Sequence, residues 1–316
     1  MSNSSVAAAQ FHEYTFPDPR YPEYTFSRYN LAESLPLDNG RFPKTPQCDL
    51  GVLDALPLEL LQSTLAQVDL ATLTEIRRVN QRARDVVDSI LEYDNIVTYV
   101  PNILRVLIVT ETASYITCKK LHDKLRDTQC EDCGYFGEYL YLLTCRRVCS
   151  ECLAKESYYP VWEQSVERIY DNYVGLTPED VSRIPRMRIL PCPYVEYVTS
   201  SLAYILDRQS LRNAQIRRGQ NTTLNICRGF MTEYAARSSS CVRIPAFDPI
   251  SKEIEWGSHC LGCYGDVKYY QYHPRPEILF IKADFHRHLN EHGRIVRRND
   301  DNGLPRYFHD RVVATS

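Results

Sequence analysis

Long apolar runs are missing from this sequence. The longest, residues 103–109, is interrupted by Arg105 and is far shorter than the roughly 20 residues of a membrane-spanning helix. The N-terminal residues include neither the basic segment nor the apolar core of a signal peptide. We therefore expect an intracellular protein of the cytoplasm, the nucleus or both, without a membrane partner. In such a compartment its 12 cysteines are poor candidates for disulfides.

An excess of positive charge is also missing. The net charge is -3 and the pI is about 6.3, so the chain as a whole does not attract a phosphate backbone. No Ser/His/Asp order, phosphate-binding loop or dinucleotide fingerprint is present. The sequence therefore predicts no catalytic residues and no enzymatic activity, and it argues against nucleic acid as a partner.

The composition is sufficient for a folded core, because 44% of the 316 residues are hydrophobic and 24% are charged. We expect a mainly α-helical fold with a minor β component. Residues 1–47 are expected to form a disordered arm and residues 298–316 a loose tail. The tetrapeptide Glu-Tyr-Thr-Phe occurs twice in the arm, at residues 13–16 and 23–26, and is a candidate peptide-docking motif.

Residues 48–92 have the spacing of short amphipathic helices. Apolar residues recur three and four positions apart, at Leu56, Leu60, Leu61, Leu65, Leu73, Ile76, Val79, Val86, Val87 and Ile90. Pro57 suits the first turn of a helix, and Asp69 and Asn80 stand where N-caps would fall. The spacing predicts three helices. So small a unit cannot bury all of its leucines internally, and part of its apolar surface should be left for a partner.

The region from residue 93 to residue 297 mixes helical patterns with cysteine-rich segments. Residues 95–127 have a helical pattern with a break at Pro101, and helical patterns return at residues 162–173 and 197–217. We expect this region to recognise a substrate, although no residue in it indicates which one.

Two Cys-x2-Cys pairs lie close together, Cys130 with Cys133 and Cys149 with Cys152. Fifteen residues separate the pairs, a spacing typical of a four-cysteine zinc site. The strand-like residues 139–143 would bring the second pair back to the first, and Zn²⁺ accepts four thiolates tetrahedrally. A shell filled by protein ligands leaves no open position for water, so we expect a structural zinc. Cys145 breaks the spacing and is interpreted as a buried thiol near the site.

A third Cys-x2-Cys pair, Cys260 and Cys263, precedes His288 and His292. The two histidines are four residues apart and would share one face of a helix. These residue types indicate a second structural zinc, although the 24 intervening residues are too many for a regular DNA-reading zinc finger. His259, His286 and Cys241 compete as ligands, and a pair of cysteines without metal beside surface histidines is the alternative interpretation.

Residues 53–90 resemble an F-box. The family pattern Leu-Pro-x-Glu-Leu-Leu is met by Leu56, Pro57, Glu59, Leu60 and Leu61, and it continues through Leu65, Leu73 and Val79. The chain from there through the cysteine pairs, to residue 292, is similar to the F-box proteins of filamentous fungi, which carry zinc-knuckle sequence after the F-box.

The resemblance implies an adaptor. The F-box would dock on the Skp subunit of a Skp–cullin–F-box ubiquitin ligase, and the remainder would present a protein substrate for ubiquitination. The expected contact residues are Leu56, Pro57, Glu59, Leu60, Leu61, Leu65, Leu73, Ile76 and Val79. The alternative function is a zinc-stabilised nucleic-acid-binding protein, or a scaffold whose F-box-like fold does not engage a ligase.

Overall fold

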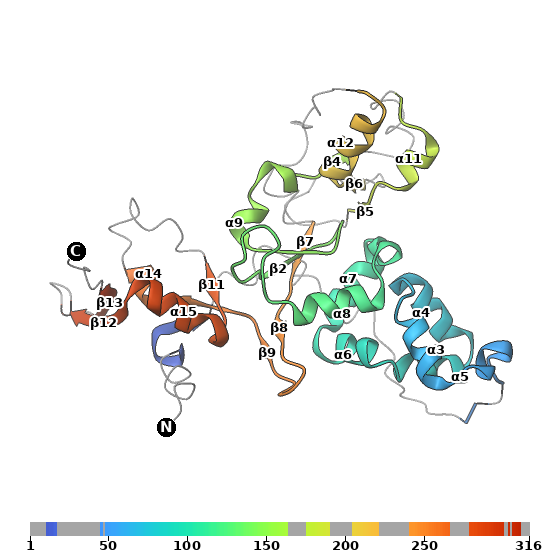
Figure 1. Ribbon diagram of the computed structural model, residues 1–316, viewed down its shortest axis with the longest axis horizontal. Coiled ribbons are helices and arrows are strands. Elements are labelled where there is room, and N and C mark those ends of the chain that lie inside the picture. The colour runs from blue at the N-terminus through green and yellow to red at the C-terminus, as the bar shows by residue number, and fades with distance from the viewer. Residues whose placement is uncertain are drawn as a thin grey trace.

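The computed structural model describes residues 11–17, 45–46, 48–163, 175–189, 204–220, 240–265, 278–299, 303 and 305–310. Its elements form an elongated molecule with the first helices at one end and the C-terminal strands at the other (Figure 1). Helices dominate the first part, and short antiparallel strands the rest. The expectation of a mainly helical fold with small β elements is confirmed. Among the described residues, no helix combines the length and the hydropathy required to cross a membrane.

Three short helices follow a single 3-10 turn, as the spacing predicts. The elements are η2 (Gly51–Ala55), α3 (Leu58–Leu65), α4 (Leu70–Val79) and α5 (Gln81–Asp88). Asp69 caps α4 by accepting the N–H of Thr72 at 2.9 Å, and Asn80 caps α5 by accepting that of Ala83 at 2.7 Å. Pro57 stands at the N-cap of α3, where its missing N–H costs nothing.

The next helices continue the same body. They are α6 (Leu91–Tyr99), α7 (Pro101–Val109), η3 (Thr112–Tyr115) and α8 (Cys118–Arg126). Pro101 starts α7, so the expected break is present. The start of α8 is hydrogen-bonded to the loop between α3 and α4, because Cys118 N–H donates to Val68 and Lys119 N–H to Ala66. The three-helix unit is therefore joined to α8 by backbone bonds as well as by packing.

The central sheet carries the first cysteine pairs. It has the order β3 (Arg146–Val148), β2 (Tyr139–Tyr141), β7 (Cys241–Arg243), all antiparallel. Around it lie α9 (Ser150–Leu153), η4 (Glu156–Tyr158) and the small hairpin of β8 (Ala246–Phe247) and β9 (Ile254–Glu255). One continuous apolar core runs from Leu61 in α3 through the helices to Cys149 and Phe247.

A second small sheet has a smaller core of its own, while its buried Met187 and Ile205 belong to the main core. It consists of β4 (Val161–Glu163), β6 (Tyr204–Leu206) and β5 (Arg186–Arg188), with α11 (Pro178–Ser182) and α12 (Arg208–Arg217). The helical pattern expected at 162–173 begins in strand β4, and residues 164–173 lie outside the described residues. Of the pattern at 197–217, residues 197–203 lie outside the described residues, Tyr204–Leu206 pairs with two strands, and the helix begins at Arg208.

The C-terminal elements form a third body, which we call the C-terminal module. It contains β10 (Ser258–Cys260), α14 (Leu261–Gly265), β11 (Leu279–Phe280), α15 (Lys282–His292), β12 (Arg294–Asn299) and β13 (Pro305–Asp310). Strand β1 (Thr15–Pro17) joins it by pairing with β10. The arm, which was expected to be disordered, therefore contributes β1, and the tail, which was expected to be loose, contributes β13. Such short segments are too short to show the alternating pattern of a strand in the sequence.

Candidate docking face and candidate metal centres

An apolar face lies open on η2 and the first turn of α3. Val52 is 88% exposed and Leu60 is 56% exposed, and Leu53, Leu56 and Leu58 are exposed beside them. We call these five residues, with Pro57, the docking face. Within the part of the chain that the structure describes, nothing covers it. So many large apolar side chains on one short segment are typical of a surface that another protein buries.

Polar contacts hold the turn that carries this face. The Asp54 carboxylate accepts the N–H of Leu50 at 2.7 Å and the Nε–H of Arg82 at 3.0 Å. The hydrogen bond from Leu50, followed by that from Arg82, lowers the pKa of Asp54. Because Arg82 lies on α5, the pair ties η2 to the third helix. Arg82 thus supports the turn that carries the docking face.

The expected contact residues separate into two groups in the structure. Five are exposed: Leu56, Pro57, Glu59, Leu60 and Val79. Three are core residues instead, with Leu61 only 2% exposed and Leu65 and Leu73 also buried, while Ile76 is half-buried. Val52, Leu53 and Leu58 of the docking face were not among the expected contact residues, because they precede or begin α3 and do not share its apolar spacing. These three residues could have been predicted from the sequence, because they are large apolar residues in a segment that is too short to bury them.

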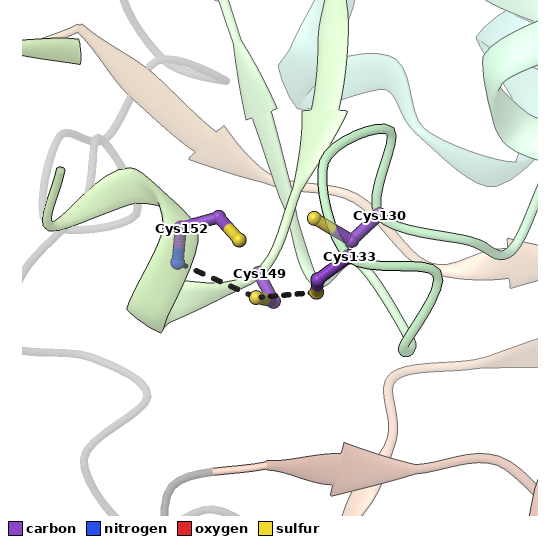
Figure 2. A group of neighbouring side chains, drawn as sticks. All are labelled: Cys130, Cys133, Cys149 and Cys152. Carbon is purple, nitrogen blue, oxygen red and sulfur yellow. Dashed lines mark hydrogen bonds between the residues drawn. The ribbon is translucent and has the colours of Figure 1, made fainter. Parts of the chain in front are cut away.

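The first cysteine cluster brings together the four residues predicted from spacing. The ligand atoms of Cys130, Cys133, Cys149 and Cys152 all lie within 4.8 Å of one another, and the Sγ atoms of Cys133 and Cys149 are 3.6 Å apart. Figure 2 shows two sulfurs coming from the loop before β2 and two from the end of β3 and the start of α9. Gly134 closes the first turn with a φ of 77°, a conformation that favours glycine.

Proximity sets the ionisation of these thiols. A hydrogen bond from Cys149 lowers the pKa of Cys130 to about 4, and the same bond raises that of Cys149. Burial raises the pKa of Cys133 to about 11. One thiolate is thus stabilised by neighbouring thiols, whereas four thiolates at this distance would repel one another without a cation.

Cys145 lies outside this cluster, as interpreted from its spacing. Its side chain is fully buried in the main core, and burial raises its pKa to about 12. A thiol in this state is unreactive. Its φ of 55° places it in the turn between β2 and β3, so it serves the hairpin as a small apolar residue.

Arg147 joins the hairpin to the rest of the core. Its fully buried guanidinium donates to the carbonyls of Gly137, Lys124, Pro245 and Ile244, at distances from 2.6 to 3.2 Å. It also lies over the ring of Phe136 at 5.1 Å. Burial lowers its pKa to about 10, so it remains charged at neutral pH. One side chain thereby connects α8, the hairpin and the segment after β7.

The second cluster contains Cys260, Cys263, His288 and His309, with ligand atoms also within 4.8 Å of one another. Nε2 of His309 is 3.4 Å from both sulfurs, and Nε2 of His288 is 3.4 Å from the Sγ of Cys263. Burial opposes ionisation of Cys260, but hydrogen bonds from Cys263, His288 and His309 outweigh it and lower its pKa to about 2. Three of the four residues are those predicted.

The fourth residue differs from the prediction. His309 comes from β13, while His292 lies at the end of α15 with its ring 4.7 Å from that of His288. Nδ1 of His309 is 3.0 Å from the carbonyl oxygen of Gly293. This contact makes Nδ1 the donor, so Nε2 is the unprotonated nitrogen that could ligate a metal. Helical spacing pointed to His292, but the pairing of β12 with β13 brings His309 closer.

The competing ligands have other surroundings. His259 is buried against Phe16, His286 is exposed on α15, and Cys241 is buried in the central sheet. Gly262 has a positional role, because a Cβ there would meet the imidazole of His309 at 2.8 Å. The Cys260–Cys263 turn therefore needs glycine for His309 to approach.

Both clusters have the residue types and the spacing to hold a metal ion. Neither includes a carboxylate positioned as a general base, and each could complete a tetrahedral shell from protein side chains alone.

Comparison with known families identifies the first three helices. Residues 53–95 match the F-box domain, and the chain therefore carries an F-box, followed by cysteine-rich segments that fit a zinc-knuckle-like feature. F-box domains bind the Skp subunit, which links them to a cullin. No curated protein and no solved structure matches the chain.

Proposed function

We propose that this chain is an F-box adaptor that docks on the Skp subunit of a Skp–cullin–F-box ubiquitin ligase and presents a protein substrate. The observation that carries the proposal is the docking face, which lies within or beside the matched F-box. Ubiquitin transfer would belong to other subunits, and this chain would raise the effective concentration of the substrate near them.

The separation of exposed from buried leucines supports this function. Leu61 and Leu65 hold α3 against the core, so Leu56 and Leu60 remain available to a partner. A helical interface gains most of its binding energy from a few central residues in well-packed pockets. Leu56, Leu60 and Pro57 are the central residues of the docking face, with Glu59 at its polar edge.

We further propose that both Cys/His clusters hold zinc as a structural ion. Thiolate and imidazole are the ligands that Zn²⁺ favours, and four of them form its usual tetrahedral shell. The contact from His309 to the carbonyl of Gly293 supplies the orientation that metal-bound histidines commonly have.

The test is co-expression of the full chain with the Skp subunit. Wild-type chain should co-purify with it at one to one, and metal analysis should give two zinc ions per chain. The variant Leu56→Asp/Leu60→Asp should lose the complex, because two charges would be buried in the interface. Leu61→Asp is unsuitable, since a charge at this buried position would disrupt the core itself.

The matched control is Ile216→Asp, an exposed apolar residue on α12, 58% exposed and outside the F-box. It should bind the Skp subunit as the wild type does. If the docking-face variant co-purifies fully while retaining its helical circular dichroism, the adaptor proposal is wrong.

A further inference from the structure

A segment from the start of the chain lies on the C-terminal module. Strand β1 pairs antiparallel with β10, with Thr15 opposite Cys260 and Phe16 opposite His259. The other edge of β10 pairs with β11, so β1 completes a three-stranded sheet. In Figure 1 this blue segment lies beside α15, while the next described part of the chain begins the helices at the opposite end of the molecule. The segment thus binds the module as a separate added strand would.

Three aromatic side chains hold the segment in place. Phe11 is 5% exposed and meets Phe285 edge to face at 5.3 Å. Phe16 lies between His259 at 5.3 Å and Tyr264 at 5.1 Å, and Tyr14 contacts Tyr307 at 6.4 Å. Thr15 donates its hydroxyl hydrogen to the carbonyl of Phe11, which closes the turn before the strand. The contacts therefore come from the first, fourth, fifth and sixth residues of a hexapeptide, Phe-His-Glu-Tyr-Thr-Phe.

The same pattern recurs ten residues later in the sequence. Residues 21–26 read Tyr-Pro-Glu-Tyr-Thr-Phe and repeat each contact-making position, with tyrosine in place of phenylalanine at the first. The second position changes from His12 to Pro22, but the side chain of His12 is exposed and the strand pairing begins only at Thr15. A proline there removes no ladder hydrogen bond. Both copies of the hexapeptide therefore have suitable residues at the four positions that make contacts.

We propose that the surface of β10, Tyr264, Phe285 and Tyr307 is a peptide-binding site that accepts an aromatic-x-x-Tyr-Thr-Phe segment by strand addition, and that residues 21–26 of the chain are its second ligand. The backbone ladder supplies sequence-independent affinity, and the aromatic contacts supply selectivity. The first copy is the stronger ligand, because Tyr21 would bring a hydroxyl into the apolar position of Phe11. Two copies compete for one site.

The chain offers a direct test by photo-cross-linking. Replacing Tyr264 with p-benzoylphenylalanine in the full chain keeps an aromatic ring beside the position of Phe16. Trypsin separates the two copies, since it cuts after Arg20 and Arg28, giving peptides 1–20 and 21–28. Irradiation should attach mainly peptide 1–20. In the variant Phe11→Ala/Phe16→Ala, the share of cross-links on peptide 21–28 should rise at least tenfold.

The control adds Tyr24→Ala/Phe26→Ala, which should remove the new product. A second variant, Phe16→Ala alone, retains the buried Phe11 and therefore disturbs the fold of the module less. It should raise the share of cross-links on peptide 21–28 by a smaller factor. If the 21–28 product stays at the level of the control in both the double and the single variant, the second copy is not a ligand and the proposal is overturned. The result is independent of Skp binding, so it is separable from the adaptor proposal.

Discussion

The two Cys/His clusters reach similar geometry by different routes. In the first, all four ligands come from one hairpin, and the neighbouring sulfurs of Cys133 and Cys149 are 16 residues apart in sequence. In the second, Cys260 meets His309 across 49 residues, and β10, α14, α15 and β13 must all be assembled before the ligands meet. The first cluster is a local motif, whereas the second is a product of tertiary structure.

Their surroundings differ in the same way. Three cysteines of the first cluster are buried in the core that also contains Leu61 and Leu73 of the F-box, and Cys133 packs against it. The second has a separate core built from Phe11, Phe280, Phe285 and Ile295 around Cys260. Removing the first cluster should therefore destabilise the F-box as well, whereas removing the second should destabilise only the C-terminal module. This contrast can be tested at several levels.

The largest effect should come from Cys130→Ser/Cys149→Ser. Structural zinc sites contribute on the order of 10 kcal/mol of binding free energy to folding, and this site lies in the main core. The variant should lose one metal ion per chain, its cooperative thermal transition and its complex with the Skp subunit. Cys260→Ser/Cys263→Ser should lose one metal ion and keep the complex. Equal retention of the complex by both variants would contradict the contrast.

The next effect concerns Arg147, which has no counterpart among the described residues of the second cluster. Arg147→Met should lower the free energy of unfolding by about 3 kcal/mol, because four buried carbonyls would lose their donor. Chemical denaturation measures the change. Arg146→Met on the same strand is the control, since its ion pairs with Glu131 and Asp132 are partly exposed, and it should cost less than about 1 kcal/mol. Similar losses in both variants would show that burial of the guanidinium is unimportant.

A third comparison concerns His309, the member of the second cluster that the sequence spacing did not predict. His309→Ala should reduce the metal content of the full chain from two ions to one, whereas His292→Ala should leave it at two. Native mass spectrometry resolves these states. The opposite result would show that His292 is the fourth metal ligand and that His309 on β13 does not bind the ion.

The smallest effect is a pH dependence beside the first cluster. Glu138 is buried under the hairpin, where its Oε1 accepts the N–H of Ser150 at 2.8 Å, and burial raises its pKa to about 7. A carboxyl whose pKa is raised in the folded state contributes stability below its unfolded value of about 4.5, and this stability is lost as the pH rises through about 7.

Glu138→Gln should therefore have little effect at pH 5 and should stabilise the protein by about 1 to 3 kcal/mol at pH 8. The amide oxygen can still accept from Ser150. Unfolding curves of both chains at each pH measure the difference, and comparison between the chains cancels the titration of the cysteines. A constant difference across this range would mean that Glu138 is ionised throughout.

Local sequence patterns were sufficient to predict several parts of this structure. Helix periodicity and two N-caps located α4 and α5, and the Cys-x2-Cys spacing found all four residues of the first cluster. The F-box pattern named the leucines of α3 but could not separate exposed Leu60 from buried Leu61, because that division depends on α5 packing against one face of α3.

The other features depend on contacts between distant segments of the chain. These contacts bring His309 rather than His292 into the second cluster, and they form strands in both the arm and the tail. They also bring residues 11–17 to the end of the molecule opposite the F-box. Short strands carry little periodicity, and their register depends on a partner strand that can lie anywhere in the chain. Spacing determines a site when one turn brings the ligands together, and packing determines it when separate segments must first meet.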